Sequence, residues 1–138
     1  MVANPDKFQV IFPGCSNENI CLKVGSTYMK SSSEVKLLGV TIDKQLTFYP
    51  HVRAICKHAS SKTKALMRIR NYISDAKASH LVNAFILSAF NYCPLIWMFC
   101  SKMAHNLINS THRRILCAKT GSFSSSLEDL LAVTNSVS

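Results

Sequence analysis

The chain has 138 residues, of which 48% are hydrophobic and 17% are charged, so it is long and apolar enough to bury a core. This composition excludes a disordered segment and a minidomain. Sixteen Lys and Arg residues stand against seven Asp and Glu residues, which gives a net charge of +9. Such an excess of cations favours a polyanionic partner over a small-molecule substrate.

Three segments near the N-terminus alternate apolar and polar residues in the manner of β-strands. They are residues 7–12, 20–24 and 35–42. Turn-forming residues separate these segments, namely Pro13, Gly14, Ser16 and Asn17, then Gly25 with Ser26, and then Ser31 to Ser33. We therefore predict a small antiparallel sheet in this part of the chain.

A helical period begins after Phe48, where Pro50 stands at a first-turn position. Apolar residues then recur at steps of three and four, which predicts one stripe facing a core. The stripe comprises Val52, Ile55, Ala59, Thr63, Leu66, Ile69 and Ile73. That stripe is the predicted core face of the first long helix.

A second helix is predicted from about Ser74 to Tyr92, with Ser74 as its N-cap and Pro94 forcing a turn after it. A third helix is predicted from Ala104 to Lys119, closed by Gly121 in a left-handed conformation.

A last short helix is expected after residues 122–126, because Ser125 and Glu128 have capping-box spacing ahead of Leu130 and Leu131. The predicted fold class is α+β, with a small antiparallel sheet or hairpin region in residues 1–47 and a helical region in residues 48–138.

The cysteine pattern indicates a reducing compartment. Six cysteines occur without a CxxC pair, and the N-terminus has no apolar signal-peptide core. We therefore predict reduced thiols and an intracellular location, cytoplasmic or nuclear. His51, Cys56 and His58 match no zinc spacing, so no metal site is predicted.

One stretch raises the alternative of a membrane protein. Residues 78–101 contain no Lys, Arg, Asp or Glu over 24 residues, which is long enough for a transmembrane helix. Asn83 and Asn91 are polar, however, and Pro94 would interrupt the backbone hydrogen bonds. A buried helix followed by a turn is therefore favoured over a membrane span.

The first long helix carries the clearest functional signal. At about 100° per residue, its cations fall within about 60° of one another and opposite the apolar stripe, spread over about 22 Å of helix. The face consists of Arg53, Lys57, Lys64 and Arg68, with Ser60 and Ser61 between them. Solvated faces usually mix Glu with Lys at i,i+4, and this one has no Glu. We interpret it as a surface for the phosphates of a nucleic-acid duplex.

Several segments, in order along the chain, resemble the end of the palm and the start of the thumb of LINE-type (non-LTR) retrotransposon reverse transcriptases. The similar segments are NPDKF (residues 4–8), VKLLGVTIDKQLTF (residues 35–48), HVRAICKHASSKTKALMRI (residues 51–69), FNYCPLIWMFCS (residues 90–101) and SSLEDLL (residues 125–131). The resemblance implies a thumb-like helical region and a primer–template duplex, RNA or DNA, as partner, together with the upstream palm.

The resemblance also implies roles for single residues. Asn4 and Lys7 resemble the palm strand where the family's lysine approaches the incoming nucleotide, so Lys7 would assist the pyrophosphate leaving group. Phe8 departs from the threonine that often follows that lysine. Leu38, Gly39 and Val40 resemble the primer-grip hairpin, where a glycine lets the backbone lie close to the primer. A simple β-bulge at Gly39 is an equal alternative.

The chain lacks the acids that polymerases use. Two divalent ions are held by clustered carboxylates in such enzymes, and the parent enzyme would use Mg²⁺. Here no neighbouring acids occur before Glu128 and Asp129, so the family's catalytic aspartates would lie upstream of Asn4. We therefore expect a fragment that binds primer–template but does not polymerise and holds no cofactor. A degenerate transposon product without selected activity and a small membrane-associated protein are the alternatives.

Overall fold

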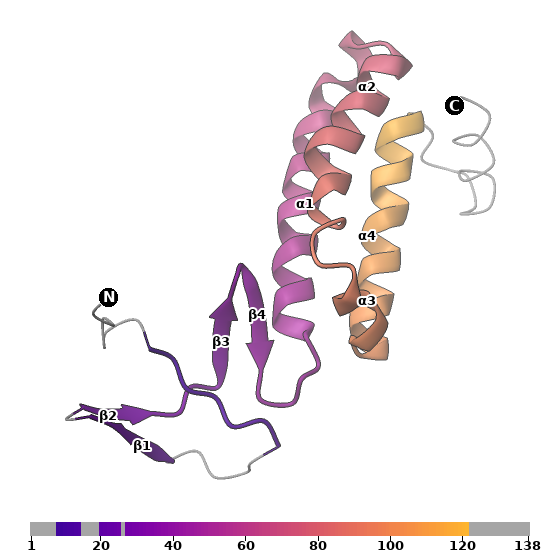
Figure 1. The fold of residues 1–138 in the computed structure, drawn as a ribbon. Helices are drawn as coiled ribbons and strands as arrows, with labels where there is room; N and C mark the ends of the chain where they lie inside the picture. The colour runs from indigo at the N-terminus through magenta and orange to yellow at the C-terminus, as the bar shows by residue number, and fades with distance from the viewer. Residues whose placement is uncertain (1–7, 15–19, 26, 122–138) are drawn as a thin grey trace.

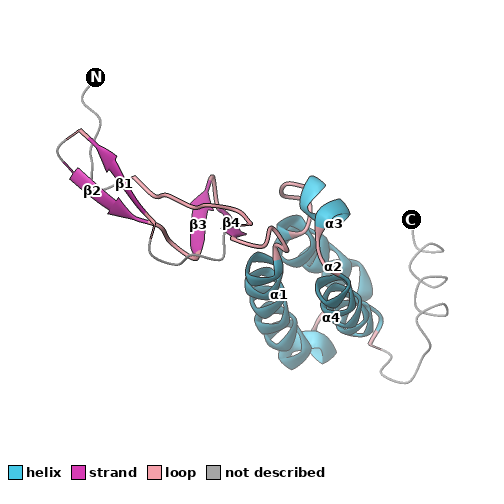
Figure 2. Ribbon diagram, turned by 90° about the horizontal axis from the view of Figure 1, so that it is seen from below, coloured by secondary structure: helices cyan, strands magenta, loops and turns pink. Residues whose placement is uncertain are grey.

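The computed structural model describes residues 8–14, 20–25 and 27–121, and these form two β-hairpins followed by a set of helices (Figure 1). The α+β class predicted from the sequence is confirmed. In both views the second hairpin lies between the first hairpin and the helices (Figures 1 and 2).

Each hairpin is a separate two-stranded antiparallel sheet. Strand β1 (Cys21–Val24) pairs with β2 (Thr27–Lys30), and β3 (Glu34–Leu37) pairs with β4 (Val40–Asp43). A backbone bond from Ser31 N to the Ile20 carbonyl, 3.0 Å long, closes the open end of the first hairpin. The predicted small antiparallel sheet or hairpin region is thus two separate hairpins, and no ladder joins them in the described part of the chain.

Two of the predicted strands are wrong in detail. Residues 35–42 are not one strand but the hairpin β3–β4, because Leu38 (φ 48°) and Gly39 (φ 85°) are both left-handed and reverse the chain. Residues 8–12 form no strand. Single contacts hold them instead, such as the 2.8 Å bond from Ser32 N to the Val10 carbonyl. Lys7 lies outside the described residues.

The helical region starts with α1 (Tyr49–Ile69), which has Pro50 in its first turn as predicted, and a short 3₁₀ turn, η2 (Arg70–Tyr72). The predicted second helix is irregular. It begins as α2 (Asp75–Leu81), widens into a π-helical turn η3 (Val82–Ile86), and ends as a 3₁₀ turn η4 (Leu87–Ala89). It therefore stops three residues before the predicted end at Tyr92, and the Ser74 side chain makes no cap hydrogen bond.

A short helix that the sequence analysis missed, α3 (Leu95–Phe99), follows the turn at Pro94. The predicted third helix is confirmed as α4 (Lys102–Thr120). Ser101 caps its start by accepting a hydrogen bond from Ala104 N at 3.3 Å, and Gly121 (φ 74°) closes its end as predicted. The last predicted helix, with Ser125, Glu128, Leu130 and Leu131, lies outside the described residues.

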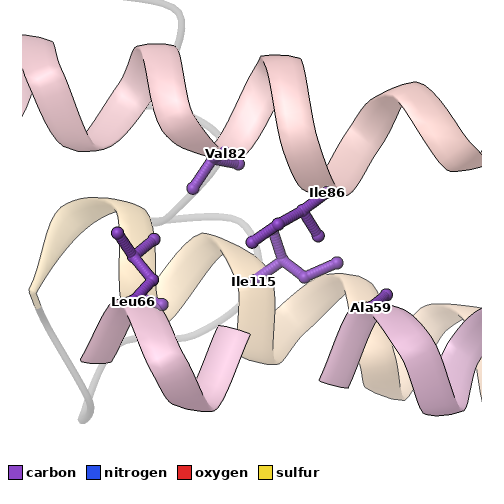
Figure 3. Close-up of a cluster of buried hydrophobic side chains, with 6 residues drawn as sticks. Ala59, Leu66, Val82, Ile86 and Ile115 are labelled. Carbon is purple, nitrogen blue, oxygen red and sulfur yellow. The ribbon is translucent and has the colours of Figure 1, made fainter. Parts of the chain in front are cut away.

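The core lies where α1, the irregular second helix and α4 meet. Side chains from all three converge in one cluster of Ala59, Leu66, Val82, Ile86, Ile115 and Ala118 (Figure 3). A second cluster joins the start of α1 to α3 and the start of α4, through Val52, Cys56, Ile96, Cys100 and Ala104. The two clusters make α1 and α4 run side by side in the same direction (Figure 1).

The predicted apolar stripe of α1 is correct over most of its length. Val52, Ala59, Thr63 and Leu66 are buried. The prediction fails at the end of the helix, where Ile69 is 46% exposed because the chain turns away into η2. Ile55 and Ile73 are half-buried.

Arg70 fastens the C-terminal ends of α1 and α4 to each other. Its Nε donates to the Ala118 carbonyl and its Nη2 to the Lys119 carbonyl, both at 3.1 Å. The same guanidinium donates to the Ile73 carbonyl at 3.2 Å and pairs with Asp75. The last carbonyls of a helix have no hydrogen-bond donor within the helix. Arg70 supplies donors to two of these carbonyls in α4, which water would otherwise have to hydrate.

Candidate nucleic-acid interface

The predicted basic surface lies on the solvent side of α1. Arg53, Lys57, Lys64 and Arg68 are all exposed, and together we call them the α1 cation row. Ser61 is exposed between them, whereas Ser60 is half-buried. The buried side chains of α1 occupy the opposite side of the helix, since the core clusters are built from Val52, Cys56, Ala59 and Leu66.

The α1 cation row is not neutralised within the described part of the chain. The only ion pair found among the described residues joins Arg70 to Asp75, beyond the end of α1. Four uncompensated cations on one helix repel one another and raise the local positive potential. Such a surface is stabilised when a polyanion replaces its counterions.

Lys62 differs from the α1 cation row although it belongs to the same helix. Its ammonium group donates a 2.8 Å hydrogen bond to the Phe85 carbonyl in η3. Lys62 also borders an apolar groove of about 410 Å³ between α1 and the second helix, which Leu66, Ile69, Leu81, Phe85 and Ile86 line with it. Lys62 therefore lies on a different side of α1 from the α1 cation row, next to the second helix.

The tip of the β3–β4 hairpin is anchored to the segment after the second helix. The Tyr92 hydroxyl donates to the Leu38 carbonyl. A Cβ added to Gly39 would lie 3.8 Å from the Tyr92 ring, which is ordinary contact, so it is the left-handed φ that favours glycine there. Gly39 is thus a turn residue and not a β-bulge. Leu38 is 83% exposed, and Val40 is half-buried and packs on the second core cluster.

An apolar pocket of about 310 Å³ lies between this hairpin and α3. Its wall comprises Leu37, Leu38, Val40, Ile42, Phe48, Tyr92, Cys93, Leu95, Ile96 and Phe99. The pocket lies between the primer-grip-like residues Leu38 and Val40 and the segment of residues 90–101, and Tyr92 and Leu38 are 54 positions apart in sequence.

His51 links the hairpin to α1 through the edge of β4. In this hairpin Lys36 and Thr41 face each other with their N–H groups pointing outward. The Thr41 N–H donates to Nδ1 of buried His51 at 3.2 Å, and the Lys36 N–H donates to the Gln9 side chain at 3.1 Å. The two strand edges are therefore closed by side chains at this position, where a neighbouring strand would otherwise pair.

The acceptor role of His51 Nδ1 requires a neutral ring with its proton on Nε2. Burial, together with the positive charge of Lys36, lowers the pKa of His51. His51 Nε2 is buried and has no hydrogen-bond partner in the described structure. The contact with Thr41 is therefore intact only while the imidazole is neutral.

Asp43 shapes the connection from β4 into α1. Its carboxylate accepts hydrogen bonds from the Thr47 N–H at 3.1 Å, the Thr47 hydroxyl at 2.8 Å and the Phe48 N–H at 2.7 Å. Burial alone would raise the pKa of Asp43, but the hydrogen bonds from Thr47 and Phe48 outweigh it and the pKa is lowered. Asp43 thereby orients the first turn of α1 relative to the hairpin.

Comparisons with known proteins identify no family for the chain. No family model, no curated protein and no solved structure matches it. The resemblance to LINE-type reverse transcriptases therefore stays a prediction, as do the roles that it implies for Lys7, Leu38, Gly39 and Val40.

The described residues contain no group of three or more His, Cys, Asp or Glu side chains placed to hold a metal ion. The five described cysteines, Cys21, Cys56, Cys93, Cys100 and Cys117, are free thiols, and Cys15 lies outside the described ranges. The uncharged stretch 78–101 is divided among α2, η3, η4 and α3. Within residues 8–14, 20–25 and 27–121, no helix has the length and apolar character needed to cross a membrane.

Three residues that hold the β3–β4 hairpin against the helical region were not predicted from the sequence, namely Asp43, His51 and Tyr92. In each case a hydrogen bond joins the hairpin to the helical region. The donors and acceptors are Phe48 N–H with Asp43, Thr41 N–H with His51, and the Tyr92 hydroxyl with the Leu38 carbonyl. Only Asp43 had a recognisable signal, since an Asp shortly before a helix commonly accepts backbone N–H groups of its first turn. His51 and Tyr92 sit in helical or apolar segments that give no hint of their partners.

Proposed function

We propose that this chain binds the sugar-phosphate backbone of a nucleic-acid duplex through the α1 cation row without reading base sequence. One observation carries the proposal: Arg53, Lys57, Lys64 and Arg68 lie exposed on one face of a 21-residue helix and have no carboxylate partner among the described residues. A B-form duplex carries about one negative charge per 1.7 Å of its axis. A row about 22 Å long therefore meets many phosphates at once.

The rigidity of α1 supports this role. The helix is fixed at its start by Asp43 and at its end by Arg70, and its inner face is packed in two core clusters. The cation row thus approaches a duplex with a fixed spacing, and little conformational entropy is lost on binding apart from that of the side chains. Phosphate contacts of this kind position a protein but carry no sequence information.

The sequence resemblance supplies the biological setting of the proposal. The chain would be the end of the palm and the thumb-like region of a LINE-type retrotransposon reverse transcriptase, holding primer–template for a catalytic centre upstream. By itself it would bind the duplex and not extend a primer, because the carboxylates that hold two Mg²⁺ ions in polymerases are missing. The β3–β4 tip at Leu38 and Gly39 would then face the primer strand.

A salt titration tests the proposal. Fluorescence anisotropy measures the association constant K of the whole chain with a blunt duplex of about 20 base pairs. A plot of log K against the logarithm of the salt concentration should be a straight line with a negative slope. Four phosphate contacts give a slope of about −3.6. Duplexes of unrelated sequence should bind equally well. A slope near zero, or a strong preference for one sequence, would contradict backbone binding by this row.

A further inference from the structure

The β1–β2 hairpin has two chemically different faces. Side chains alternate across a strand, and the register pairs Cys21 with Lys30 and Lys23 with Tyr28. These four residues therefore project from one face, while Leu22 and Met29 project from the other. The first face joins two cations and an aromatic ring, and neither strand contains an Asp or Glu.

The aromatic ring on this face is open to solvent. Tyr28 is 70% exposed, and the Lys23 ammonium lies 5.5 Å from the centroid of its ring. A cation at that distance is attracted by the π-electrons and helps to hold the ring in place. Lys30 is also exposed, two residues further along the strand and on the same face. A ring held in this way can stack on an uncharged nucleobase, and the cations beside it can contact the neighbouring phosphates.

The geometry points to a second nucleic-acid contact on this hairpin: we propose that Tyr28 stacks on a base of a single-stranded segment while Lys23 and Lys30 bind its phosphates. A single strand is favoured over a duplex because bases in a duplex already stack on one another, so their faces are not available to a side chain. Stacking of this kind accepts any base, since every base has a π-face.

The position of the hairpin separates this contact from the α1 cation row. β1–β2 lies on the far side of β3–β4 from the helices in both views (Figures 1 and 2). A duplex bound along α1 and a single strand bound at Tyr28 would therefore occupy different parts of the chain. The inference goes beyond the proposed function, and its test does not require the α1 cation row to bind.

The test compares three probes with the whole chain: a blunt duplex, the same duplex with a single-stranded overhang of about 10 nucleotides, and the isolated single strand. Sites on single strands usually cover about 4–16 nucleotides per binding module. The wild-type chain should bind the overhang duplex more tightly than the blunt one. It should also bind the isolated strand, even if the blunt duplex does not bind at all.

The decisive variant is Tyr28→Thr, which removes the ring but keeps a residue that favours strands. It should weaken binding of the single strand roughly 5- to 150-fold, the usual effect of losing one stacked base. Tyr28→Phe keeps the ring and should bind like the wild type. The matched control is Tyr72→Thr, because Tyr72 is 88% exposed but lies on η2, away from this hairpin.

The outcomes separate clearly. The proposal is overturned if Tyr28→Thr binds the single strand as the wild type does, or if Tyr72→Thr weakens binding as much. It is also overturned if Tyr28→Thr weakens the blunt duplex and the single strand equally. Should Tyr28→Thr unfold the hairpin, the variant Lys23→Gln with Lys30→Gln replaces it, and it should flatten the salt slope of single-strand binding by about 1.4.

Discussion

Removing two neighbouring members of the α1 cation row gives the sharpest prediction. Lys57→Ala with Lys64→Ala takes away two exposed cations, and alanine favours the helix, so folding should be preserved. Each lost phosphate contact changes the slope of log K against log salt by about 0.9, so the double variant should flatten it by about 1.8. If the wild type and the double variant bind the duplex equally at about 1 M salt, where the cations contribute least, the double variant should bind roughly 60-fold more weakly at about 0.1 M.

The controls remove the same charge from other places. Lys62→Ala lies on the same helix but on the flank that contacts Phe85, so it should change the slope by clearly less than Lys64→Ala alone. Lys77→Ala with Lys102→Ala removes two exposed cations from α2 and α4. Anisotropy titrations at several salt concentrations measure all four variants. Equal flattening by both double variants would mean diffuse attraction to a protein of net charge +9, and the reasoning from a local row would be refuted.

Four further predictions concern the rest of the chain. The purified chain should not extend a primer with Mg²⁺ or Mn²⁺, and template-dependent extension by a preparation free of other polymerases would disprove the assignment. Burial and Lys36 lower the pKa of His51 in the folded state. Between that lowered pKa and the ordinary pKa of about 6.5, the unfolded state therefore binds more protons than the folded state. The free energy of unfolding in urea should therefore be highest above about pH 6.5 and should fall as the pH decreases below it. The fall should be smaller in His51→Asn, and equal pH profiles for the two proteins would contradict this. Asp43→Ala should cost roughly 1–3 kcal/mol in the same urea titrations because it leaves N–H groups at the start of α1 unpaired, and an unchanged unfolding midpoint would exclude that role. Thiol titration after denaturation should find six thiols, and metal analysis should find no zinc; fewer thiols or stoichiometric zinc would refute the prediction.

The elements that could be predicted from sequence are those whose signals are local. The period of apolar residues in α1, Pro50 at its start and Gly121 after α4 are readable from neighbours within one or two turns. The α1 cation row follows from the same helical period, because the side on which each side chain lies is fixed once the helix and its buried face are known. These predictions needed no knowledge of what the helix packs against.

The errors arose where a local pattern had two outcomes. The alternation in residues 35–42 suits either one strand or a hairpin, and the left-handed backbone at Leu38 and Gly39 decided for the hairpin. An apolar run after Ser74 predicts a helix but not the π-helical turn at Val82–Ile86. The short helix α3 was missed because five residues give too few periods to recognise.

The sequence by itself determined the fold class, the long helices and the face of α1 that carries its cations. The tertiary structure alone decided which cations remain free: Lys62 and Arg70 are engaged by distant carbonyls, whereas Lys57 and Lys64 are exposed and outside every ion pair of the described residues. It also decided that His51 and Tyr92 fix the β3–β4 hairpin to the helices. The physical reason is that helix period and capping depend on near neighbours along the chain, whereas these hydrogen bonds join atoms that only folding brings together.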